Sequence, residues 1–119
     1  MHPSLQVHGA LARGAFAVAV LVSLAVLFAP ASDVPDAPPG VDKLVHVAVF
    51  LALAFTGRWA GVRAGVLGAL LVAYAAVSEV VQAVTPLERS GSVADLLADV
   101  VGVALGLGAW ALGERRGRA

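Results

Sequence analysis

The sequence contains no cysteine, and only 13% of its 119 residues are charged. Without cysteine, the chain cannot form disulfide bonds, thiolate metal sites or a cysteine nucleophile. Acidic and basic residues balance to a formal net charge of zero, so bulk charge gives no reason to expect a nucleic-acid partner. Aromatic residues are also few, at 6%.

Apolar residues dominate instead. They make up 60% of the chain, and the mean hydropathy is +0.90, well outside the usual range of soluble domains. Most of them are Ala, Val and Leu, interspersed with Gly, and such small residues favour close helix packing within a lipid bilayer. The composition predicts an all-α fold, an integral membrane four-helix bundle, with residues 1–119 forming a single transmembrane domain.

Apolar segments long enough to cross a bilayer, roughly 17 to 20 residues, recur along the sequence. Pro30 ends the first segment and Pro86 follows the third, as expected where helices stop. Together these signals predict spans at about 12–29, 43–59, 64–84 and 92–112.

Basic residues predict the orientation of these spans. Six of the eight lie at the start of the first span, around the connection between the second and third, and after the fourth: Arg13, Arg58, Arg63, Arg115, Arg116 and Arg118; Lys43 and Arg89 lie at the other ends of the spans. Because cytoplasmic loops are enriched in Lys and Arg, both the N- and C-termini are expected in the cytoplasm. In an alternative interpretation the first span is a signal peptide, and cleavage before Ser32 would leave three spans.

The polar residues of the spans gather in the half of the membrane away from the cytoplasm. They are Asp42, Lys43 and His46 on the second span, Glu79 and Gln82 on the third, and Asp95 and Asp99 on the fourth. A carboxylate facing lipid at this depth would cost on the order of 1–3 kcal/mol. These groups are therefore expected to face the bundle interior or a wet cavity.

On the fourth span, Asp95, Asp99, Gly102 and Gly106 recur at helical spacing and form one stripe. Gly102 and Gly106 make a small-xxx-small pair, which lets helix backbones approach closely. The pair predicts helix packing, either within the chain or against a second copy in a homo-oligomer.

Three short patterns resemble the VanZ-like family of small bacterial membrane proteins. They are Asp42-Lys43-x-x-His46 opening one apolar helix, Glu79-x-x-Gln82 closing another, and Arg89, Asp95 and Gly102 leading into the last. The resemblance covers about residues 41–110. It implies a multi-pass protein of the bacterial cytoplasmic membrane that acts in the cell envelope, since the family is named after a protein associated with low-level resistance to the glycopeptide teicoplanin. It implies no reaction.

One position departs from this family pattern. The pattern often has Asn four residues after the Asp, where this chain has Asp99. The extra acid would need a proton, or pairing with Lys43 or Arg89. For His46, the residues leave two interpretations open: a neutral imidazole hydrogen-bonded to Glu79 or Asp95, or a titrating group in a pocket.

His46, Glu79, Asp95 and Asp99 are residue types that bind divalent metals or carry protons. None of their spacings in the sequence is a metal motif, and no phosphate-binding or nucleophile motif is present. The sequence therefore predicts neither a metal nor a cofactor.

Three functions remain open. In the first, the outer ends of the helices enclose a polar cavity for an amphiphilic envelope ligand, with Arg89 closing over the acidic cluster or gripping an anionic group. In the second, the protein is an enzyme acting on an envelope lipid or peptidoglycan precursor, with Glu79 or Asp99 as base and Arg89 and Lys43 holding the anion. In the third, the cluster only holds helices together in a structural or assembly subunit. The sequence favours a role without catalysis.

Overall fold

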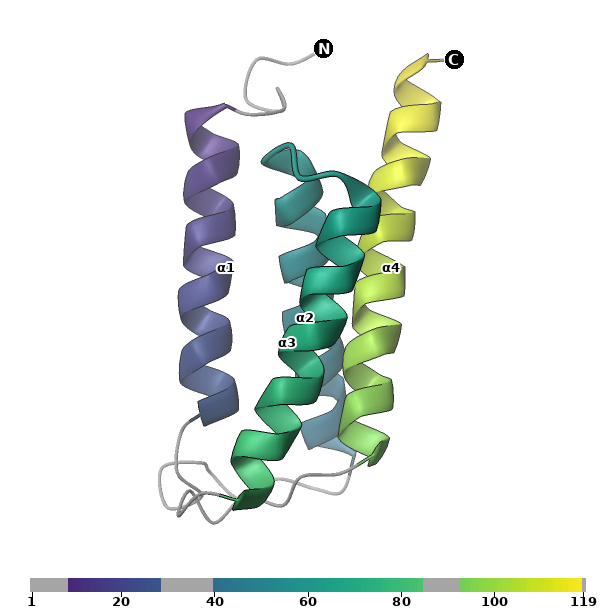
Figure 1. The fold of residues 1–119 in the computed structure, drawn as a ribbon. Helices are drawn as coiled ribbons and strands as arrows, with labels where there is room; N and C mark the ends of the chain where they lie inside the picture. Colours follow the sequence, from purple (N-terminus) through teal and green to yellow (C-terminus); the bar gives the residue numbers. More distant parts are fainter. Residues whose placement is uncertain (1–8, 29–39, 85–92, 119) are drawn as a thin grey trace.

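The computed structural model describes residues 9–28, 40–84 and 93–118. This part of the chain forms a bundle of helices in which successive helices run antiparallel, and it contains no strands (Figure 1). The helices are α1 (Ala10–Phe28), α2 (Val41–Trp59), α3 (Ala64–Val84) and α4 (Val93–Arg118). Helices α2 and α4 run in one direction, and α1 and α3 run in the other, so that α1 begins at the end of the bundle where α4 finishes. The all-α prediction is confirmed.

Three of these helices are long and apolar enough to cross a membrane: α1, α3 and the 93–116 part of α4. Helix α2 is as long as α1, with 19 residues, but it carries Asp42, Lys43 and Arg58 near its ends. It packs against the other three helices, while large apolar side chains of those helices, such as Leu21, Leu70 and Leu97, point outward. An exterior of this kind fits the lipid-facing surface of a membrane bundle.

The apolar core lies where α2 meets its neighbours. Phe50, Leu53 and Ala54 of α2 are buried against Leu67 and Leu71 of α3. Leu27 of α1 and Val103 of α4 are buried in the same cluster, and partly buried side chains of both helices extend it. Helix α2 therefore organises the bundle, and its buried face fixes the position of the polar residues that begin the same helix.

Helix α4 lies closest to α2 at two glycines. A Cβ placed on Gly102 would overlap the carbonyl oxygen of Val47, and one on Gly106 would lie 2.5 Å from the carbonyl oxygen of Leu51. Only glycine permits so close an approach of two backbones. The small-xxx-small pair is therefore used inside the chain, against α2.

Helix α4 continues beyond the predicted end of its span at residue 112. Its last turns are joined to α2, because Arg58 Nη2 lies 3.7 Å from Glu114 Oε1, an oxygen that also accepts a hydrogen bond from Trp110 Nε1 of α4 at 2.8 Å. Apolar content alone gives no sign of this polar extension.

A tight turn joins α2 to α3. Gly61 has a φ of 100°, and its N–H donates to the Arg58 carbonyl while the N–H of Val62 donates to the Gly57 carbonyl, both at 3.0 Å. This is the Schellman arrangement, in which the residue after the helix is left-handed and favours glycine. The turn reverses the chain, so that α3 runs antiparallel to α2.

Replacing Gly61 tests this turn. In the Gly61→Ala variant, the left-handed conformation should lower the free energy of unfolding by about 1–2 kcal/mol. Denaturation of the purified chain in mixed micelles, followed by circular dichroism, measures the change. The matched control is Gly65→Ala on α3, which has open space around its Cβ position and should be neutral or slightly stabilising. Equal stability of the two variants would contradict the assignment.

Candidate functional site

The predicted polar residues converge at one end of the bundle, where α2 and α4 begin and α3 finishes (Figure 1). Most of them are buried: the exposed fraction is 1% for His46, 0% for Asp99, 5% for Asp95 and 8% for Glu79. At 1.5 Å per residue, Asp99 lies about 9 Å from the start of α4, so the cluster reaches well into the helical bundle.

The outer layer of the cluster joins α2 to α4 by an ion pair. Lys43 Nζ lies 2.6 Å from Asp95 Oδ1 and 3.5 Å from Asp42 Oδ2. The side chains of Lys43 and Asp42 are 43% and 52% exposed, whereas that of Asp95 is 7% exposed. The layer therefore has an accessible rim on α2 and a buried acid on α4.

The inner layer is one turn deeper. His46 Nδ1 and Asp99 Oδ1 are 2.6 Å apart, the distance of a strong charge-assisted hydrogen bond in which the imidazole N–H donates to the carboxylate. Glu79 of α3 also belongs to this layer, because its carboxylate lies within 4.8 Å of donor atoms of His46 and Asp99. Three helices thus contribute to a buried group of ionisable side chains.

The two layers and the glycines form one continuous ladder between parallel helices. Lys43 meets Asp95, His46 meets Asp99, and deeper along the same faces Phe50 approaches Gly102. The two basic partners are three residues apart on α2, and the two acidic partners are four residues apart on α4. These spacings place the residues of each helix on one face. The close glycine contact therefore holds the polar pairs at bonding distance.

The structure assigns partners that the sequence did not give. The hydrogen bond of His46 Nδ1 goes to Asp99 rather than to Glu79 or Asp95, and Asp99 is paired with this imidazole rather than with Lys43. Lys43 pairs with Asp95 instead. The physical reason is depth, since Asp99 lies one turn further along α4 and is level with His46. Arg89, the other predicted partner of Asp99, lies outside the described residues.

Gln82 belongs to a different contact. Its Nε2 donates to the carbonyl of Leu27 on α1 at 2.5 Å, so it ties α3 to α1 rather than contributing to the acidic cluster. Ser23 of α1 similarly lies 2.9 Å from the hydroxyl of Tyr74 on α3. Ser23 was missed by sequence reasoning, and its only signal was a lone hydroxyl inside an apolar helix.

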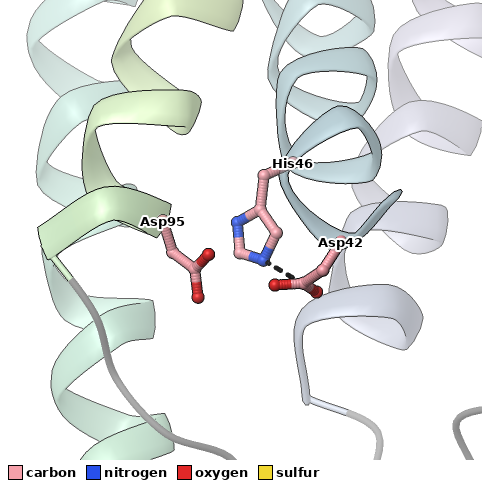
Figure 2. Close-up of side chains that lie close together, drawn as sticks. All are labelled: Asp42, His46 and Asp95. Carbon is pink, nitrogen blue, oxygen red and sulfur yellow. Dashed lines mark ion pairs between the residues drawn. The ribbon is translucent and has the colours of Figure 1, made fainter. Parts of the chain in front are cut away.

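Two sets of side chains in the described residues have donor atoms within 4.8 Å of one another and could hold a metal ion. One is Asp42, His46 and Asp95, shown in Figure 2, and the other is His46, Glu79 and Asp99. Both depend on His46, which has one ring nitrogen on each side. The second set contains Asp99, to which His46 Nδ1 is already hydrogen-bonded.

The fold and this cluster define a small all-α membrane protein with a buried group of ionisable residues at one end. The chain belongs to the VanZ/LLP1 family, whose model matches residues 14–113, from α1 to α4. No curated protein and no solved structure matches the chain.

Proposed function

We propose that this protein lies in the cytoplasmic membrane of a bacterium with four crossings, its polar cluster facing away from the cytoplasm. The distribution of charge supports this orientation: Arg13, Arg58, Arg63 and Arg115 lie at the end of the bundle opposite the cluster. Because cytoplasmic loops of membrane proteins are rich in Lys and Arg, the end of the bundle that carries these arginines is expected to face the cytoplasm. In this proposal α2 crosses as well, packed against the other three helices.

We further propose that the protein acts in the cell envelope by binding the polar group of an amphiphilic envelope molecule, and that this binding protects against lipoglycopeptides. The observation that supports this proposal is the decrease in side-chain exposure from the rim of the cluster to its interior. Lys43 and Asp42 are accessible, and they lie directly above His46 and Asp99, which are buried. Ionisable residues inside a membrane are expensive, and they usually mark a functional path or site. Lys43 offers an ammonium, and the carboxylates offer acceptors, to a headgroup arriving at the rim.

The test is antibiotic susceptibility in cells that express the chain. Glu79→Ala, Arg89→Ala and Asp95→Ala should each reduce protection against a lipoglycopeptide several-fold, whereas Glu114→Ala, at the opposite end, should leave protection unchanged. Membrane levels of every variant are measured by immunoblotting. Full protection by the Glu79, Arg89 and Asp95 variants at normal levels would defeat the proposal.

A structural role is the second candidate, and the cross-helix pairs favour it. Lys43–Asp95 and His46–Asp99, each at 2.6 Å, connect α2 to α4 as a helix lock would. In that case the same alanine variants would disappear from the membrane rather than persist without activity. The immunoblots of the susceptibility experiment therefore separate the two functions.

A further inference from the structure

We propose that Asp42, His46 and Asp95 form a binding site for a divalent transition-metal ion, with Zn²⁺ the best match. Figure 2 shows the imidazole of His46 lying between the two carboxylates, which come from α2 and α4. Donor atoms of the three side chains lie within 4.8 Å of one another. One imidazole nitrogen with carboxylate oxygens is a ligand set that suits Zn²⁺. No spacing motif in the sequence indicated this set, because its members are distributed over two helices.

The orientation of His46 is the strongest argument for a ligand. Nδ1 lies 2.6 Å from Asp99 Oδ1, and the neutral tautomer that donates its Nδ1–H to this carboxylate has a lone pair on Nε2. Nε2 is buried, and within the described residues it has no hydrogen-bond partner, since Asp42 Oδ1 at 3.8 Å is too distant. Histidine ligands of metals are oriented in this way by a carboxylate on the other nitrogen. Asp99 is thus a positioning residue.

Closure around an ion requires only a small movement. Ligand atoms bound tetrahedrally to Zn²⁺ at about 2.0–2.1 Å lie roughly 3.3 Å apart, so atoms that are now within 4.8 Å of one another must approach by at most about 1.5 Å. Asp42 is 52% exposed and can rotate toward the ion, whereas His46 and Asp95 are held by their surroundings. The exposed rim also gives the ion access. With three protein ligands, a further position remains for water.

Lys43 acts as a competing cation in the metal-free state. Its ammonium lies 2.6 Å from Asp95, a proposed ligand, and its side chain is 43% exposed, so it can move away into solvent.

The experiment measures Zn²⁺ binding by the full chain purified in detergent with an affinity tag that contains no histidine. His2→Gln and His8→Gln are introduced first, which leaves His46 as the histidine of the sequence. After removal of metal with EDTA, Zn²⁺ is titrated against a chromophoric chelator. We expect one Zn²⁺ per chain. No Zn²⁺ binding by this parent protein would overturn the proposal.

Two substitutions with opposite expected signs identify the ligands. Asp42→Asn removes an exposed ligand that the fold does not need, and it should weaken Zn²⁺ binding at least about tenfold. Lys43→Gln removes the competing ammonium and should tighten binding several-fold. Glu114→Gln deletes one acid at the far end and should bind Zn²⁺ as the parent does. Unchanged affinity in Asp42→Asn would show that the ion is bound elsewhere. This site extends beyond the proposed ligand role, and its test does not depend on protection in cells.

Discussion

Gly106→Ala should destabilise the protein by about 3 kcal/mol, although alanine is the better helix former. The new Cβ would lie 2.5 Å from the Leu51 carbonyl oxygen and 2.6 Å from the Ala54 Cβ. Neither neighbour is the flexible end of a long side chain, so α4 must move away from α2. Chemical denaturation in mixed micelles gives the free energy of unfolding.

Gly108→Ala is the matched control for this prediction. Gly108 lies on the same helix, two residues further on, and no atom lies within 4 Å of its Cβ position. The gain in helix propensity, roughly 0.5–1 kcal/mol, is common to both substitutions, so their difference isolates the contact with α2. If both variants were equally stable, the close approach of α2 and α4 would be refuted.

The contact also determines the geometry of the cluster, because the polar pairs lie on the same helix faces. A shift of α4 at Gly106 would be transmitted along the rigid helix toward Gly102 and the pairs beyond it. Gly106→Ala should therefore weaken Zn²⁺ binding as well, whereas Gly108→Ala should not. The glycines and the polar residues thus act as one packing unit.

The sequence predicted the faces of the helices better than their partners. Periodicity alone placed Asp95, Asp99, Gly102 and Gly106 on one stripe of α4, and the structure sets this whole stripe against α2. Helical spacing is a local property, and it requires no knowledge of the fold. Placement of the polar residues at one end followed from the same periodicity and the order of the helices.

The register between helices could not be predicted in this way. Pairing Lys43 with Asp99, one of the alternatives that the sequence left open, requires α4 to slide by about one turn, or 5.4 Å, relative to α2. Both registers satisfy the same periodicity. The choice depends on where the glycine of one backbone fits against the carbonyls of the other, and this is a property of the packed pair. The link between Ser23 and Tyr74 was missed for the same reason.

Replacing Asp99 by Ala should lower the free energy of unfolding of the metal-free protein by about 3 kcal/mol. The substitution leaves His46 Nδ1–H buried without its acceptor, and both side chains are almost fully buried, at 0% for Asp99 and 1% for His46. His46→Ala should cost a similar amount, because it leaves the carboxylate of Asp99 without its donor. Denaturation is measured in the presence of EDTA, so that metal binding does not contribute.

Asp99→Asn provides the sharper comparison, because it installs the residue that the family pattern often has at this position. The amide oxygen keeps an acceptor for His46 Nδ1–H but loses the negative charge. A neutral hydrogen bond is worth roughly 1 kcal/mol and a charged one about 1.5–3 kcal/mol, so Asp99→Asn should cost about 1 kcal/mol. Stability should therefore fall in the order wild type, Asp99→Asn, Asp99→Ala.

The double variant His46→Leu/Asp99→Leu separates stability from function. Two apolar side chains remove both buried polar groups at once, and exchanges of this kind are often neutral or stabilising by about 1–4 kcal/mol. If the pair served only to hold α2 against α4, this variant would be stable and would protect cells normally. We expect it to be stable but unable to bind Zn²⁺ and unable to protect cells. A buried ionisable pair lowers stability relative to an apolar pair, and a contact with a purely structural role would not require it. Retained protection in a stable double variant would assign the inner layer to helix packing alone.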